Sequence, residues 1–207
     1  MANVSPRTIN LEIKVLRMIL QRAKCWGRLT DGYKPLKENT RGPGIALTQE
    51  EERRLFETAA ANPLWEAAYL AALVAVNTTM RSVEIRNLRL SDVDLLNRTV
   101  TVRREGTKTD AGCREIPLND VARWAFARLL ERARLLGATD GEHYLFPAFR
   151  FRHTKGDQPA DGAGYDPTRP VKTWRTAWRS LKKAAGLPKL RFHDLRHTSI
   201  TKLAEAG

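Results

Sequence analysis

The sequence predicts a mainly α-helical protein with a small three-stranded antiparallel β-sheet, an α+β fold. Apolar residues recur at helical spacing along much of the chain, which is the pattern of amphipathic helices. Residues 91–118 instead alternate apolar and polar side chains and contain two turn signals, "LLNR" and "TDAG", which predict strands. At 207 residues the chain is long enough for one good core with a smaller appendage.

The first predicted element is an amphipathic helix over residues 6–26. Ser5 can cap this helix, and Pro6 fits its first turn. Its apolar residues share one face: Ile9, Ile13, Leu16, Leu20 and Ala23. Residues 27–44 are rich in Gly, Pro, Asn and Asp and lack a sustained period. We therefore expect a linker there and a second domain over residues 45–207.

The second predicted domain opens with three helices. "TQEE" is a capping box, with Thr48 as N-cap and Glu51 three residues later, and it predicts a helix through Ala60. The apolar run of residues 63–76 predicts a helix that is buried on most sides. A short helix is expected over residues 81–88, directly before the predicted sheet.

Further along the chain, a helix is expected over residues 119–137, and the Gly-, Pro- and Asp-rich residues 149–169 predict a mobile loop. A helix over residues 170–186 separates into two faces. Its apolar stripe comprises Trp174, Trp178, Leu181 and Ala185. The opposite basic face comprises Lys172, Arg175, Arg179, Lys182 and Lys183. This basic face is a candidate DNA-binding surface, and the alternative is a solvated charged face over ordinary core tryptophans.

The composition favours a polyanionic partner. The formal net charge of +13 indicates nucleic acid first and an anionic membrane surface second. The most apolar run, residues 64–76, contains Glu66 and is too short to span a bilayer, so no membrane partner is expected. Cys25 and Cys113 lie far apart without a metal-binding pattern, which predicts reduced thiols and no zinc site. With no secretory signal pattern, the expected location is the cytoplasm, near the nucleoid.

Three separate stretches hold candidate catalytic residues. His193 and Arg196 are three residues apart, which makes them neighbours on a helix. Arg81 shares a helix face with Glu84, an acid that can hold the guanidinium in place. Lys108 lies on the turn side of the predicted hairpin, where its ammonium group can reach a ligand. Each stretch alone also has a structural interpretation: a solvated basic helix end, a surface ion pair and a solubilising lysine.

Together, the order and separations of these stretches resemble the tyrosine recombinases, the phage-integrase family of DNA strand-transfer enzymes. "TTMRSVEIRNLRLSDVD" looks like the first Arg box of the family, "TKTDAGCREIPL" like its hairpin Lys segment, and "HDLRHTSITKLAEAG" like its His-x-x-Arg box. "SPRTINLEIKVLRMILQRAKCWG" is similar to the last helix region of the preceding DNA-clamping, or core-binding, domain. The resemblance implies a tyrosine-recombinase catalytic-domain fold over residues 45–207 and double-stranded DNA as the partner.

The resemblance also implies a role for each candidate residue. Arg81 and Arg196 would bind the non-bridging oxygens of the scissile phosphate, and Glu84 would orient Arg81. His193 would add a hydrogen bond or a proton transfer, and Lys108 would protonate the leaving 5′ oxygen. Two guanidinium groups can stabilise the charge of a pentacoordinate phosphorane without a metal ion. No metal or other cofactor is therefore expected.

The sequence also departs from the family pattern. In the family a Leu-Gly-His segment and the attacking Tyr follow the His-x-x-Arg box, whereas none of the four tyrosines here lies after Arg196: Tyr33, Tyr69, Tyr144 and Tyr165. We therefore expect a catalytic-domain fragment that lacks the nucleophile, either part of a full recombinase or the product of a decayed integrase gene. Thr79 stands where the family often has Gly, which affects the expected turn before Arg81.

The expected function is site-specific DNA recombination and integration by phosphoryl transfer, in a chain that cannot cleave DNA alone. A neighbouring recombinase protomer can supply the Tyr in trans, because family members exchange C-terminal segments. Two alternatives remain from the residues themselves. One is a non-catalytic DNA-binding or interaction module, and the other is a relative of the type IB topoisomerases, which share the same phosphate-binding set.

Overall fold

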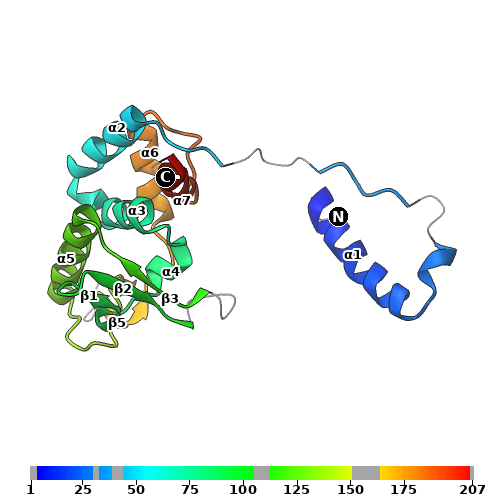
Figure 1. The fold of residues 1–207 in the computed structure, drawn as a ribbon, viewed down its shortest axis with the longest axis horizontal. Coiled ribbons are helices and arrows are strands. Elements are labelled where there is room, and N and C mark those ends of the chain that lie inside the picture. The colour runs from blue at the N-terminus through cyan, green and yellow to red at the C-terminus, as the bar shows by residue number, and fades with distance from the viewer. Residues whose placement is uncertain (1–3, 30–32, 39–43, 105–111, 151–163, 206–207) are drawn as a thin grey trace, which may run out of the picture. The chain divides into compact units, whose positions relative to one another are not determined.

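The computed structural model describes residues 4–29, 33–38, 44–104, 112–150 and 164–205. The chain forms two compact units, Met1–Pro43 and Gly44–Gly207 (Figure 1). The first unit contains one α-helix among its described residues, and the second contains the remaining helices and both sheets.

The helix of the first unit, α1 (Pro6–Arg22), confirms the predicted element but ends earlier. Ser5 caps it, as predicted, because its Oγ accepts the Thr8 N–H at 3.2 Å. Lys24 has a φ of 57°, in the left-handed region, which does not continue a helix. A short 3₁₀ turn, η1 (Trp26–Arg28), follows. None of the residues of α1 is buried within this unit.

The second unit begins with the predicted capping box. Thr48 Oγ1 accepts the Glu51 N–H at 3.2 Å, and the Glu51 carboxylate accepts the Thr48 N–H at 3.0 Å. These bonds start α2 (Gln49–Ala60), whose bounds match the prediction. The predicted buried helix starts with a 3₁₀ turn, η2 (Pro63–Trp65), and continues as α3 (Glu66–Thr78).

Helix α3 is the centre of the core. Nine of its 13 residues are buried. It packs against α2, α5 (Asp120–Leu135) and α7 (Asp194–Glu205), as Figure 1 shows. Helix α5 confirms the prediction, since Asn119 caps it by accepting the Ala122 N–H at 2.8 Å. Within the described residues no single helix is long and apolar enough to cross a membrane; one bent pair, α2 with residues 63–78, passes by length and composition alone.

The three-stranded antiparallel sheet is confirmed. Its strands are β1 (Val93–Asp94), β2 (Thr99–Val102) and β3 (Arg114–Pro117), in the order β1-β2-β3. In β2, Val100 and Val102 face the core and are at most 2% exposed. The alternation that predicted the strand therefore also identified its buried face.

The loop prediction for residues 149–169 is wrong at both ends. Strands β4 (Pro147–Arg150) and β5 (Gly164–Pro170) pair there as a two-stranded antiparallel sheet. The pairing joins Phe149 to Tyr165, whose rings contact edge to face with centroids 5.2 Å apart. Gly and Pro signals along one segment do not reveal such a contact with another strand, which is why the strands were missed. The rest of the predicted loop, residues 151–163, lies outside the described residues.

The predicted basic helix is α6 (Arg175–Ala184), which is shorter at both ends than the expected 170–186. Its predicted apolar stripe is confirmed, because these side chains are at most 9% exposed: Trp174, Trp178, Leu181 and Ala185. Phe192 packs against both tryptophans, with ring centroids 5.0 and 5.1 Å away. Phe192 precedes α7, so this cluster fixes the approach of the chain to the His193 region.

Candidate active site

A buried carboxylate organises the candidate site. Glu84 lies in the short helix α4 (Ser82–Arg86), and its side chain is 1% exposed. It accepts the Arg81 N–H at 2.9 Å and Arg81 Nη1 at 2.8 Å. From β3, Arg114 Nη2 donates to the same carboxylate at 3.0 Å. Burial opposes ionisation, but the hydrogen bonds from Arg114 and Arg81 outweigh it, so the pKa of Glu84 lies below its ordinary value.

The turn between α3 and α4 presents Arg81. Thr79 ends α3 in the left-handed conformation, with φ 54° and ψ 14°, the geometry for which Gly is favoured. Arg81 then stands at the N-cap position of α4, so the helix expected over residues 81–88 is shorter, Ser82–Arg86. Its side chain stays 52% exposed although Glu84 holds one nitrogen. Arg81 is therefore both oriented and accessible to a ligand.

Arg196 meets this group from α7, far along the sequence. Its Nη1 donates to the Thr79 carbonyl oxygen. Burial lowers the Arg196 pKa, the positive charges of Arg81 and then Arg114 lower it further, and Glu84 opposes them. Two guanidinium groups therefore bind one carboxylate, and the charge of a third, Arg196, acts on the same group. We call Arg81, Arg114, Arg196 and Glu84 the arginine site.

His193 lies beside the arginine site but not on the helix. Helix α7 begins at Asp194, so the expectation that His193 and Arg196 share a helix is corrected: His193 directly precedes the first turn, which contains Arg196. The His193 ring packs edge to face on His197, with centroids 5.2 Å apart and planes at 88°. Burial lowers the His193 pKa, followed by the charges of His197 and Arg196. Of the arginine-site residues, Arg196 is the one whose charge acts on His193.

The fourth predicted catalytic residue, Lys108, lies outside the described residues. The segment that contains it connects β2 to β3. The β3 end of this connection is Arg114, which donates to Glu84 and also, through Nη1, to the Gly112 carbonyl at 2.9 Å. The hairpin is therefore fixed to the arginine site at its base, and the position of Lys108 stays a prediction.

Arg114 is the site residue that sequence reasoning missed. It occurs in the quoted segment "TKTDAGCREIPL", but only the lysine was singled out. The sequence contained a signal for Arg114. Arg114 and Ile116 are two positions apart on β3, so their side chains share a face of the strand. Ile116 packs against the core, so an arginine on the same face needs an internal acid as its partner. Glu84 is that acid.

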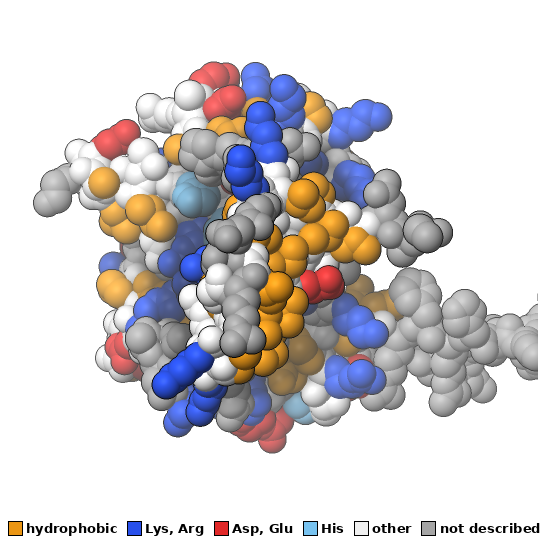
Figure 2. All heavy atoms as spheres, turned by 90° about the vertical axis from the view of Figure 1, so that its right-hand side faces the viewer, with side chains coloured by type: hydrophobic (Ala, Val, Ile, Leu, Met, Phe, Trp, Pro, Cys, Tyr) orange, Lys and Arg blue, Asp and Glu red, His pale blue; other side chains and the backbone are white. Residues whose placement is uncertain are grey.

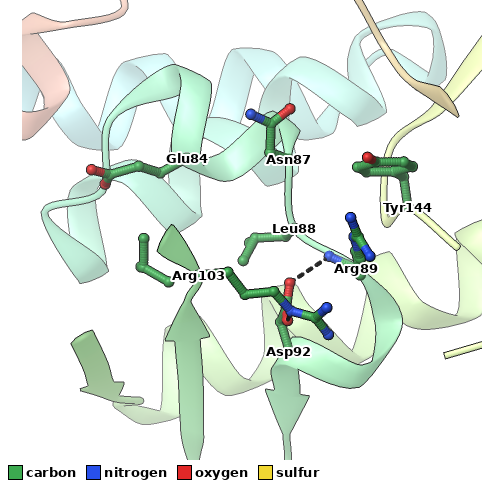
Figure 3. A pocket seen from close by; sticks show the side chains of 8 residues that line it. Glu84, Asn87, Leu88, Arg89, Asp92, Arg103 and Tyr144 are labelled. Carbon is green, nitrogen blue, oxygen red and sulfur yellow. Dashed lines mark hydrogen bonds and ion pairs between the residues drawn. The ribbon is translucent and has the colours of Figure 1, made fainter. Parts of the chain in front are cut away.

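A second cluster of acids and arginines lies next to Glu84. It borders a small cavity of about 120 Å³. Arg103 binds Asp92 and, at 3.1 Å, Glu142, while Arg89 also binds Glu142. In Figure 3 the Arg103 guanidinium lies beside Asp92, and the Arg89 side chain extends toward Tyr144. We call Arg89, Asp92, Arg103 and Glu142 the balanced network. The hydrogen bonds from Arg103 and Arg89 lower the pKa of Glu142 to about 2.

The basic face of α6 is accessible except at one residue. The exposed members on α6 are Arg175, Arg179 and Lys183, and Lys172, predicted for the same helix face, is exposed but precedes the helix. Lys182 is half-buried and its Nζ donates to the carbonyl oxygens of Pro188, at 2.7 Å, and Leu190, at 3.0 Å. It therefore holds the segment between α6 and α7. Figure 2 shows Lys and Arg side chains spread over the face in view, with fewer acidic side chains among them.

Comparison with known proteins identifies the family. The model of the phage integrase family matches residues 46–207. The chain belongs to the phage integrase family. The resemblance to tyrosine recombinases is thereby confirmed, and the matched range contains every candidate catalytic residue: Arg81, Lys108, His193 and Arg196.

The relatives of this phage-integrase chain are longer proteins. The integrase of Salmonella phage P22 is 29% identical over 134 residues, which cover 64% of this chain and 31% of that protein. The transposase from transposon Tn916 of Enterococcus faecalis is 28% identical, covering 80% of this chain and 42% of that protein. The tyrosine recombinase XerA of Pyrococcus furiosus is 26% identical, with coverages of 97% and 64%. The chain thus spans between 31% and 64% of these relatives.

Solved structures show the same fold. The Tn1549 transposon integrase, in complex with circular intermediate DNA, matches with a TM-score of 0.69 at 24% identity, covering 99% of this chain and 69% of that chain. The crystal structure of XerA recombinase matches with a TM-score of 0.57 at 26% identity, covering 94% and 62%. The prediction of a tyrosine-recombinase catalytic-domain fold is therefore confirmed.

Proposed function

We propose that this chain binds double-stranded DNA and holds one phosphodiester at the arginine site, as the phosphate-binding part of a site-specific DNA recombinase or integrase. The observation that supports this most is that two guanidinium groups bind one buried carboxylate while the charge of a third, Arg196, acts on the same cluster. They leave a local excess of positive charge, and guanidinium groups bind phosphate oxygens in pairs. The solved Tn1549 integrase carries DNA, which supports the same class of partner.

The proposed roles are those that the family resemblance implies. Arg81 and Arg196 bind the two non-bridging oxygens and stabilise the charge that develops on the phosphorane. Glu84 and Arg114 keep Arg81 oriented. His193, whose lowered pKa favours the neutral imidazole, donates a hydrogen bond or transfers a proton. Lys108 protonates the leaving 5′ oxygen. That no metal or cofactor takes part is also part of this proposal.

The attacking Tyr is proposed to come from outside these 207 residues, from a further segment or a neighbouring protomer. All four tyrosines have other surroundings in the described residues, and Tyr33 packs edge to face on Trp26. Tyr69 packs between Phe56 and Trp124, while Tyr144 borders the cavity of the balanced network. Tyr165 pairs with β4. Without the Tyr, the chain binds DNA but does not cleave it.

Two further parts of the proposal concern context. Residues 1–26 are proposed to be the last helix region of a DNA-clamping domain, residues 27–44 a linker, and residues 45–207 the catalytic domain. Because DNA is the proposed substrate, we propose that the protein acts in the cytoplasm at the nucleoid. The basic face of α6, apart from Lys182, is proposed to contact the DNA backbone.

Duplex binding at several salt concentrations tests the proposal. If about five phosphates are neutralised, the logarithm of the association constant falls with the logarithm of salt concentration with a slope of about −4.5. Fluorescence anisotropy of a labelled duplex measures this slope. A slope near zero contradicts direct DNA contact. The alternative hypothesis, a non-catalytic DNA-binding module, predicts a different result for the arginines. In that case Arg81→Ala and Arg196→Ala weaken DNA binding no more than Lys183→Ala does.

Cleavage tests the catalytic part separately. A nicked suicide duplex is mixed with this chain and an intact relative that supplies a Tyr. Hybrid cleavage that disappears with Arg196→Ala in this chain supports the shared-site mechanism. Absence of any hybrid product contradicts supply of the Tyr in trans.

A further inference from the structure

Gly44 lies directly against the ring of His197. A methyl group added at Gly44 would be 2.1 Å from His197 Cδ2, 2.5 Å from Nε2 and 2.6 Å from Cγ. Carbon atoms in ordinary contact are about 3.5–4.0 Å apart, so no side chain fits between the main chain and this ring. Gly44 is needed here for space.

The segment that contains Gly44 is fixed in place by α7 itself. The Leu47 N–H donates to Thr198 Oγ1 at 3.0 Å. Thr198 is 1% exposed, so this bond is shielded from water. Because this bond anchors the chain three residues after Gly44, Gly44 cannot simply move away from the His197 ring.

Besides the main chain at Gly44, the His197 ring also contacts the ring of His193. The two rings pack edge to face at 5.2 Å. His193 precedes the first residue of α7, and its carbonyl oxygen accepts the Arg196 N–H at 3.2 Å, so its main chain is tied to the helix while its ring is not. The preceding turn is closed by Asp194, which accepts the Arg191 N–H at 2.8 Å. The orientation of the His193 ring then depends on its neighbour, His197.

We infer that Gly44 and His197 are positioning residues: the main chain at Gly44 sets the His197 ring, and the His197 ring sets His193 beside Arg196. The catalytic meaning of this arrangement rests on the proposed function, but the arrangement itself does not. The ionisable groups around His193 are His197, Arg196, Asp194 and Arg191. Displacement of His197 exposes the His193 imidazole to water.

Proton NMR of the imidazole rings tests the inference without DNA. The chain has only four histidines, so each ring C–H signal can be assigned from the variant that lacks it. In the unchanged chain we expect a nuclear Overhauser effect between the His193 and His197 rings. In Gly44→Ala we expect this effect to be lost and the His193 pKa to rise toward its ordinary value, because burial is the main cause of its lowering.

The matched control is Gly27→Ala, because a methyl group added at Gly27 has nothing within 4 Å. It should retain both the ring contact and the His193 titration. An unchanged ring contact and titration in Gly44→Ala would overturn the inference. If Gly44→Ala does not fold, His197→Ala replaces it. A shifted His193 titration in His197→Ala supports the inference, and an unshifted His193 titration overturns it. In His197→Phe the ring contact with His193 should be restored. Failure of DNA binding alone would count against the proposed function and leave this result intact.

Discussion

The arginine site and the balanced network use the same kinds of side chain for different purposes. In the arginine site, Arg81 and Arg114 bind the single carboxylate of Glu84, and the charge of Arg196 acts on the same cluster. In the balanced network, Arg89 and Arg103 bind two carboxylates, Asp92 and Glu142. Both are adjacent to the same short stretch of chain, since α4 ends three residues before Arg89.

The difference between the two clusters lies in the charge that is left over. In the balanced network two cations pair with two anions, so the described members carry no excess charge and hold the start of the sheet. Among the described residues, three cations near one anion leave a positive excess, and one of the three, Arg81, is 52% exposed. Such an excess is stable only if solvent or an anion compensates it. Both clusters contain the same types of residue, arginine and acid. They differ in the number of acids per arginine.

Removing the central carboxylate should have the largest effect. In Glu84→Gln, Arg81 and Arg114 lose their shared acid beside Arg196, and breaking a buried pair costs about 3–5 kcal/mol. Urea unfolding measures this loss. Asp92→Asn is the matched change in the balanced network and should cost less, because Glu142 still binds Arg103. Equal losses in the two variants would contradict the distinction between the clusters.

Removing one arginine from each cluster should separate binding from stability. Arg196→Ala should weaken duplex binding roughly 10- to 100-fold, since a hydrogen bond to a charged group contributes about 1.5–3 kcal/mol. Arg103→Ala should instead lower stability and leave DNA affinity close to that of the unchanged chain. Anisotropy titrations with both variants test this. The account is in error if Arg103→Ala weakens binding as much as Arg196→Ala.

The stability of the fold should depend on acid through Glu84. Its pKa is lowered in the folded state, so its contribution is complete above the unfolded value of about 4.5 and is lost as pH falls through the folded pKa. Urea unfolding between neutral and strongly acidic pH should therefore show a smaller loss of stability in Glu84→Gln than in the unchanged chain. Identical pH profiles of stability in Glu84→Gln and the unchanged chain would contradict a lowered Glu84 pKa caused by its pairing with arginine.

The smallest expected difference is between two adjacent lysines of α6. Lys183 is exposed, so Lys183→Ala should reduce the salt slope by about 0.9, the value for one phosphate contact. Lys182 binds the Pro188 and Leu190 carbonyls, so Lys182→Ala should lower thermal stability with little effect on the slope. Anisotropy at several salt concentrations and thermal unfolding measure the two effects. The reverse pattern would refute this assignment of the basic face.

Local patterns predicted much of the fold. The capping box at Thr48, the helix that starts next to Asn119 and the alternation of Val100 with Val102 all lie where the sequence placed them. These features depend on residues close together in the chain. The β4–β5 pairing was missed because its determining contact, Phe149 with Tyr165, joins residues from different segments. Gly and Pro in β5 gave only the local, misleading signal.

The candidate site was predicted in part for the same reason. Arg81 and Glu84 are three residues apart, so their pairing was predictable from helical spacing. The contact of Arg114 with Glu84 spans 30 residues, and that of Gly44 with His197 spans 153, so neither follows from a local period. The convergence of Arg196 on Arg81 was expected only from the family resemblance. These contacts between residues far apart in the sequence are formed by tertiary packing, which local periodicity does not predict.

The arginine Nε–H signals of the isotope-labelled chain, recorded by NMR during titration with duplex DNA, test the central claim most directly. The account predicts that the signals of Arg81 and Arg196 shift with bound DNA, while those of Arg89 and Arg103 keep their positions. Shifts confined to Arg89 and Arg103, or none in Arg81 and Arg196 at saturating DNA, would contradict it.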